Sequence, residues 1–161
     1  MAKYLLVAHQ TAERPELLDA AKKLAAQDWH ARFTLLVPAT PVGDLMTWEE
    51  GETQEVARAR ARSAAEALQR HGINLIGVRV GDADPVLAVA DEYLAGRRYD
   101  AIVISTLSPG LSRWIRMDVV SRLRRAHPRA RLIHVVANES QSPVGGGAAR
   151  KGRDAEGGGT R

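Results

Sequence analysis

The residues best suited to hold a ligand gather between positions 104 and 123, where the chain reads ISTLSPGLSRWIRMDVVSRL. Four hydroxyl side chains crowd around a Pro-Gly pair in this segment, namely Ser105, Thr106, Ser108 and Ser112. Gly110 is the glycine of this pair, and Arg113 stands in the first turn of an expected helix. Hydroxyls and backbone N–H groups at the start of a helix, beside an arginine, can hold one phosphate, sulfate or carboxylate. The segment therefore predicts an anion site. The alternative is that Ser108 or Gly110 only caps the helix while Arg113 faces water.

His9 and Thr11 follow the first apolar segment of the chain and are the second group of candidates. In open α/β sheets, ligands collect at the carboxyl ends of the strands, so these two side chains should lie across the same crevice as the hydroxyl-rich segment. His9 has the chemistry of a proton switch or a general base. No Ser or Cys nucleophile motif accompanies it, and no two histidines stand three or four residues apart, which a helical metal site needs. We expect no catalytic residue, no metal and no cofactor.

The elements that must position these residues follow from the apolar pattern. Five short runs rich in Leu, Ile and Val predict strands at residues 3–8, 32–37, 73–80, 100–105 and 131–137. Several are continuously apolar, which is typical of strands buried on both faces of a parallel sheet. Between them, helical spacing predicts helices at 15–27, at 48–70, from an Asp84 N-cap with Pro85 in the first turn, and at 111–126. Alternating strands and helices predict a parallel α/β sheet with right-handed crossovers.

The length and composition of the chain restrict the class of protein to which it can belong. The 161 residues suffice for one domain, expected over residues 1–137, and the glycine-rich segment 138–161 lacks any apolar period and is expected to be a disordered tail. No apolar run approaches the roughly 20 residues of a membrane span, and the start does not resemble a signal peptide. With no cysteine the chain has no disulfide framework, and we expect a cytoplasmic protein.

The densest positive stretch is RLRRAHPRAR at residues 122–131, in a chain of net charge +4. A nucleic-acid contact is conceivable there. Aromatic residues that would stack on bases are nearly absent from the stretch, and basic residues are favourable at the end of a helix. We therefore expect helix capping and solubility rather than nucleic-acid binding.

The order of the predicted elements resembles the universal stress protein family over residues 3–137. The resemblance is carried by VGDADPVLAV at 80–89, YDAIVIST at 99–106, GLSRW at 110–114 and IHVVA at 133–137. It implies a single doubly wound α/β domain, of the adenine nucleotide alpha hydrolase-like kind, with strand order 3-2-1-4-5 and helices on both faces. It also implies a homodimer that pairs through the last strand, residues 131–137, and a role in the stress response.

The chain departs from the motif with which ATP-binding members of that family hold the nucleotide. Their loop and helix after the fourth strand carry Gly-x2-Gly-x9-Gly-(Ser/Thr), so that backbone N–H groups and a hydroxyl approach the phosphates. The matching positions here are Ile104, Leu107, Met117 and Asp118. His9 stands where those members have an aspartate at the end of the first strand. The resemblance therefore implies a non-catalytic regulatory or binding domain that does not bind ATP in the family manner and holds at most a small anion. The alternative is a nucleotide-binding stress-response protein with a remodelled phosphate loop.

Overall fold

The computed structural model describes residues 1–41 and 50–138. Within them the strands are β1 (Lys3–Val7), β2 (Arg32–Pro38), β3 (Leu75–Gly81), β4 (Ala101–Leu107) and β5 (Arg131–Ala137). The helices are α1 (Pro15–Gln27), α2 (Glu50–Arg70), α3 (Pro85–Leu94), α4 (Arg113–Arg116) and α5 (Val119–Ala126). All neighbouring strands pair in parallel, in the order β3-β2-β1-β4-β5. This is the doubly wound sheet that the sequence predicts.

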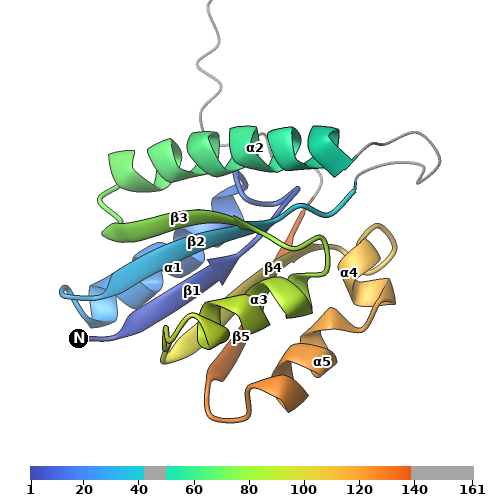
Figure 1. Cartoon of the computed structure of the whole chain (residues 1–161). Helices are drawn as coiled ribbons and strands as arrows, with labels where there is room; N and C mark the ends of the chain where they lie inside the picture. Colours follow the sequence, from blue (N-terminus) through green and yellow to red (C-terminus); the bar gives the residue numbers. More distant parts are fainter. Residues whose placement is uncertain (42–49, 139–161) are drawn as a thin grey trace, which may run out of the picture.

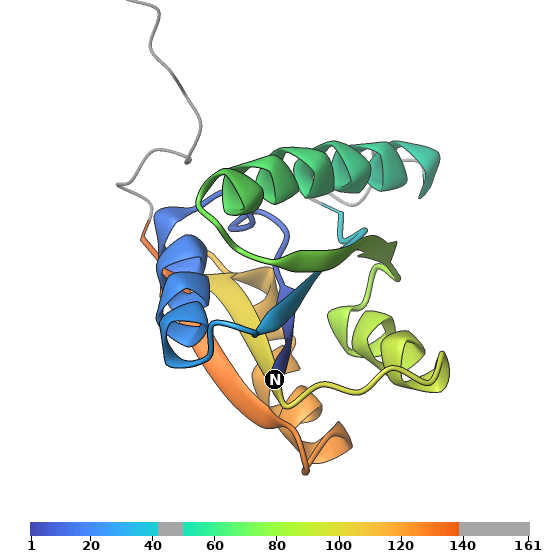
Figure 2. The same cartoon turned by 90° about the vertical axis from the view of Figure 1, so that its left-hand side faces the viewer.

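Helices cover both faces of the sheet, α1 and α2 on one side and α3, α4 and α5 on the other (Figures 1 and 2). Successive residues of a strand point to opposite faces, so each central strand feeds two cores. In β1, Leu6 packs into the core under α1 and α2, whereas Leu5 packs into the core under α3 to α5. Both leucines are fully buried, which explains why the strand reads as a continuous apolar run.

The predicted bounds of the strands agree with the structure within two residues at each end. Helix α1 spans Pro15–Gln27 as predicted, and α2 ends at Arg70 as predicted. The predicted start of the second helix, at residue 48, and the predicted tail beyond residue 138 lie outside the described residues. Asp84 is the N-cap of α3, where its Oδ1 accepts the N–H of Val86 at 2.8 Å. Its other oxygen, Oδ2, lies 2.7 Å from Nη2 of Arg122, so one carboxylate joins the start of α3 to α5.

The prediction of one continuous helix over residues 111–126 is wrong. The chain forms the four-residue α4, breaks at Met117 and Asp118, and resumes as α5. Asp118 has a φ of 53°, in the left-handed region that ends a helix. The reason is one of helical phase: at about 100° per residue, Leu123 would point about 180° away from Trp114 on a continuous helix. Both side chains are buried in the same core, and the left-handed residue between them makes that geometry available.

Candidate functional site

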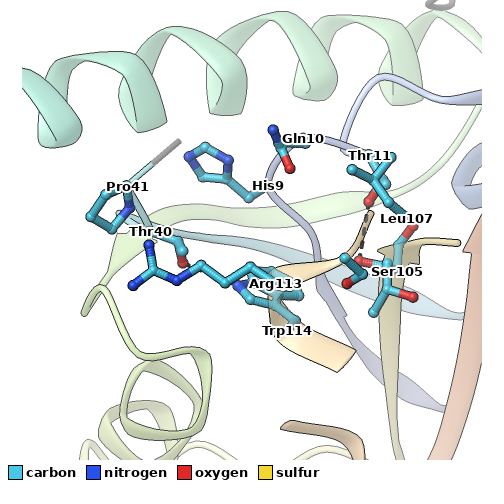
Figure 3. A pocket seen from close by; sticks show the side chains of 11 residues that line it. His9, Gln10, Thr11, Thr40, Pro41, Ser105, Leu107, Arg113 and Trp114 are labelled. Atoms are coloured by element: carbon cyan, nitrogen blue, oxygen red, sulfur yellow. Dashed lines mark hydrogen bonds between the residues drawn. The ribbon is translucent and has the colours of Figure 1, made fainter. Parts of the chain in front are cut away.

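A small cavity lies at the carboxyl ends of the central strands, bounded by the loops after β1 and β2, the end of β4 and the start of α4 (Figure 3). Its volume is about 40 Å³. It is lined by His9, Gln10, Thr11, Thr40, Pro41, Ser105, Thr106, Leu107, Ser112, Arg113 and Trp114. In the strand order β3-β2-β1-β4-β5 the chain reverses its winding direction between β1 and β4. The cavity therefore occupies the topological switch point, where this class of sheet holds its ligands.

Six of the eight residues predicted for the site line this cavity: His9, Thr11, Ser105, Thr106, Ser112 and Arg113. Ser108 and Gly110 do not. The carbonyl oxygen of Ser108 accepts the N–H groups of Leu111 and Ser112, so its part is to form the turn ahead of α4. Gly110 is exposed, with open space around it. The loop therefore presents fewer groups to a ligand than its sequence indicates.

Three of the four predicted hydroxyls that line the cavity already have hydrogen-bond partners within the protein. Thr11 Oγ1 donates to the carbonyl of Ser105 at 3.1 Å, which ties the β1 loop to β4 (Figure 3). Thr106 Oγ1 shares a hydrogen bond of 2.8 Å with Nε2 of His134 on β5. Ser112 Oγ accepts the N–H of Ile115 and caps α4. Ser105 Oγ differs, because it is buried and has no partner within the described part of the chain. A buried hydroxyl without a partner is costly, so a water or a ligand atom is expected there.

His9 is buried, with 4% of its surface exposed, and its Nε2 atom has no partner among residues 1–41 and 50–138. Burial, followed by the positive charge of Arg60, lowers its pKa to about 4. At neutral pH the ring is therefore uncharged, so it can form a hydrogen bond with a ligand but contributes no positive charge. A group with so low a pKa is poorly matched to general-base catalysis near neutral pH.

Arg113 is the arginine that lines the cavity; it is half-buried and makes no ion pair among the described residues. Figure 3 shows its guanidinium extending toward Pro41. The prediction that a long helix would direct its N-terminus at an anion is wrong, because α4 has only four residues and Ser112 already caps it. A macrodipole is the sum of aligned peptide dipoles, so one turn supplies little of it.

Five lining residues were missed by the sequence prediction: Gln10, Thr40, Pro41, Leu107 and Trp114. Thr40 Oγ1 donates to the carbonyl of Ala83 at 2.7 Å and accepts Nε1–H of Trp114 at 3.2 Å. The two residues thus join the β2 loop, the β3–α3 connection and α4. Thr40 could have been found from its place just after a predicted strand, since carboxyl ends of parallel strands meet at one edge. The contact between Thr40 and Trp114 spans 74 residues and left no local signal.

The four positions that match the family's ATP motif take other roles in the structure. Ile104 is fully buried in the core, Met117 packs against that core, and the side chain of Leu107 borders the cavity. Asp118 is exposed, with its Oδ2 atom 3.6 Å from Nη2 of Arg125. Of these four residues Leu107 alone lines the cavity, where its side chain takes space that a glycine would leave open for a phosphate group.

The described residues lack two kinds of feature, a cluster of metal ligands and a membrane-spanning helix. They contain no group of three or more His, Cys, Asp or Glu side chains placed to hold a metal ion. Across residues 1–41 and 50–138, no helix has both the length and the apolar character needed to cross a bilayer.

The structure of this chain is similar to those of known proteins. No protein-family model matches the chain, and no curated protein matches it in sequence. A universal stress protein from Archaeoglobus fulgidus superimposes with a TM-score of 0.55 at 15% identity, over 84% of this chain and 93% of that one. A protein of the universal stress protein family from Burkholderia pseudomallei gives a TM-score of 0.50 at 21% identity, over 83% of this chain and 94% of that one. With the strand order 3-2-1-4-5 and its helices on both faces, the chain has the universal stress protein fold.

Proposed function

We propose that this protein is a non-catalytic binding domain, of the kind found in stress-response regulation, whose cavity at the carboxyl edge of the sheet holds one small anion. The proposal rests on three residues that line this cavity together. Arg113 is half-buried and makes no ion pair among the described residues, and two buried polar atoms, Ser105 Oγ and His9 Nε2, have no hydrogen-bond partner there. A cation and two hydrogen-bonding groups at one cavity suit an oxyanion.

The size of the cavity argues against ATP bound in the family manner. Pockets for drug-sized or cofactor-sized ligands usually measure about 300–1,000 Å³, whereas this cavity measures about 40 Å³. A volume of that order holds a few waters or one small ion, because one water needs at least about 10–15 Å³ on this measure. Leu107 borders the cavity where a glycine of the motif would admit a phosphate.

Titration of the full chain with sulfate, inorganic phosphate and ATP, followed by thermal unfolding and calorimetry, tests the proposal. Sulfate or phosphate at ten times its Kd should stabilise the protein by about 1.4 kcal/mol. Arg113→Gln should remove most of that effect. Arg116→Gln is the matched control, because Arg116 lies on the same helix but is exposed and does not line the cavity. Micromolar ATP affinity that is lost in Arg113→Gln would instead support a nucleotide-binding protein with a remodelled loop.

We further propose that two copies of the chain pair through β5. This strand is one edge of the sheet, and no described residue pairs with its outer side. Val136 on this strand has 40% of its surface exposed, and unpaired strand edges are templates for pairing with another chain. The opposite edge, β3, exposes Ile76 and Val78 and is the competing surface.

Sedimentation equilibrium at micromolar concentration separates the two edges. Val136→Lys should convert a dimer to a monomer if β5 forms the interface, whereas Ile76→Lys should leave the dimer intact. A wild-type monomer, or a dimer broken only by Ile76→Lys, contradicts the proposed interface.

A further inference from the structure

A second, larger hollow lies at the other end of the strands from the anion cavity, where α3 and α5 end and β5 begins. We call it the basal groove, and its volume is about 380 Å³. It is lined by Tyr93, Arg98, Tyr99, Ala126, His127, Pro128, Arg129 and Ala130. Helices α3 and α5 lie on the same face of the sheet, and β5 follows directly after α5 (Figure 1). The groove is distinct from the cavity beside Arg113, and no residue lines both.

Three of the eight residues that line the basal groove carry aromatic rings, namely Tyr93, Tyr99 and His127, although its basic segment contains no Phe, Tyr or Trp. The ring of His127 stacks on that of Tyr93, with centroids 4.3 Å apart and an interplanar angle of 21°. Tyr99 meets Tyr93 edge to face at 6.0 Å. The two tyrosines are contributed by α3 and by the loop before β4, so folding supplies the aromatic surface that residues 122–131 lack. Such rings present flat apolar area to another ring.

Two arginines give the basal groove a positive rim. Nη1 of Arg98 donates to the carbonyls of Tyr93 and Arg97, at 3.0 and 2.7 Å, and its Cζ lies 5.7 Å from the centroid of the Tyr93 ring. These contacts fix the guanidinium while leaving other N–H groups available. Arg129 is exposed and makes no ion pair among the residues described. The nearby carboxylate of Asp100 is engaged by the backbone N–H of Lys3 at 2.8 Å.

Two polar atoms of the groove residues are buried without a hydrogen-bond partner in the described chain, Tyr93 Oη and His127 Nε2. Each such group destabilises a folded protein unless a water or ligand atom satisfies it. Tyr93 Oη can donate or accept, and the neutral ring of His127 can do either according to its tautomer. Both residues belong to the stacked pair, so a ligand that reaches these atoms also meets the aromatic wall.

We propose that the basal groove is a second binding site, which takes a planar aromatic ring carrying one anionic group. The aromatic wall contacts the ring, Arg98 and Arg129 contact the anionic group, and Tyr93 Oη and His127 Nε2 supply hydrogen bonds. The volume falls within the about 300–1,000 Å³ that small-ligand pockets span. Two sources share this chemistry, a free aromatic carboxylic acid and a mononucleotide.

Calorimetric titration of the full chain with benzoate and with 5′-UMP distinguishes these sources. The preferred probe should bind at least ten times more tightly than its matched compounds, which are benzamide and cyclohexanecarboxylate for benzoate, and uridine and ribose 5-phosphate for UMP. If neither probe binds at millimolar concentration, or if the ring or the charge can be removed without loss, the proposal is wrong. Affinity that rises with the length of a single-stranded oligonucleotide also overturns it, in favour of a nucleic-acid surface.

Substitutions then locate the site. Arg129→Gln should weaken binding of the preferred probe about five- to tenfold. Arg116→Gln should leave it unchanged, because Arg116 lies on α4 at the carboxyl ends of the strands and does not line the groove. Tyr93→Phe should weaken binding without lowering the thermal unfolding midpoint of the free protein, because it removes a hydroxyl that has no partner among the described residues. Weakening by Arg113→Gln and not by Arg129→Gln would place the probe in the other cavity and refute the assignment, whether or not sulfate binds beside Arg113.

Discussion

Replacing Asp118 by glycine and, separately, by alanine tests the break between α4 and α5. Asp118 adopts a φ of 53° and makes no side-chain capping hydrogen bond. Both variants lose its ion pair with Arg125, which is 3.6 Å long and largely exposed, so the difference in stability between them reports backbone conformation. Alanine in the left-handed region is less favourable than glycine by about 1–2 kcal/mol.

Alanine recovers about 0.4–1 kcal/mol through the lower entropy of its unfolded chain. Glycine should therefore be the more stable variant by about 1 kcal/mol, and its advantage as an N-cap acts in the same direction. If residues 111–126 formed one continuous helix, alanine would instead be favoured by about 1 kcal/mol. The sign of the difference thus separates the two structures, with a total separation of about 2 kcal/mol.

Urea unfolding followed by circular dichroism measures this difference, provided that the slope of the free energy against urea is equal in the two variants. Each kcal/mol should also move the thermal midpoint by about 3 °C in a chain of this size. An alanine variant as stable as the glycine variant, or more stable, would refute the left-handed assignment and the phase argument built on Trp114 and Leu123.

Three further predictions concern single side chains. The pKa of His9 is about 4 in the folded protein and about 6.5 in the unfolded chain, so on acidification the unfolded chain is protonated at His9 first. The free energy of unfolding should therefore be unaffected by this group above about pH 6.5 and fall by up to about 3 kcal/mol as the pH is lowered to 4. Wild type and His9→Gln compared by urea unfolding across that range should show the difference, and parallel pH profiles would contradict it. Asp84→Ala should lower the free energy of unfolding by about 1–2 kcal/mol, because it removes both the cap of α3 and the partner of Arg122. Arg122→Ala removes only the ion pair and should lower it by less than about 1 kcal/mol. Equal losses in the two variants would mean that the cap contributes nothing. Glu92 is buried and accepts hydrogen bonds from Arg79, Arg97 and Tyr99. Because both arginines are partly exposed to solvent, Glu92→Gln should lower the free energy of unfolding of the protein by only about 1–2 kcal/mol. An unchanged urea midpoint would show that solvent replaces these hydrogen bonds.

The fold could be predicted because its signals are local. Continuous apolar runs mark buried parallel strands, and Asp84 with Pro85 marks the start of a helix in the chain itself. The order of these elements then leaves few topologies, since crossovers are right-handed. The bounds of α1 followed directly from its apolar spacing.

The candidate site was predicted only in part, because its residues are brought together by tertiary contacts. The helix spacing of residues 111–126 gave no sign that Trp114 and Leu123 would share one core, so the break at Asp118 was missed. The hydroxyls of Ser112 and Thr106 were counted as free for a ligand, yet their partners are a backbone N–H and a histidine on another strand. The aromatic wall beside residues 122–131 is likewise invisible locally, because Tyr93 and Tyr99 come from earlier in the chain.

The hydrogen bond between Thr106 and His134 joins two parts of the molecule, the anion cavity and the outermost strand of the sheet. Thr106 lines the anion cavity, while His134 belongs to the outermost strand and is held by the same hydroxyl. An anion that accepts the hydrogen of this hydroxyl leaves the hydroxyl only as an acceptor toward the imidazole, which must then carry its proton on Nε2. A partner that covers β5 changes the solvent around the same imidazole. Because coupling between two binding events is reciprocal, assembly at the edge and occupancy of the cavity would then alter each other's equilibrium constants by the same factor. That factor can be measured as the shift in dimer dissociation constant caused by saturating anion, and Thr106→Val should abolish it.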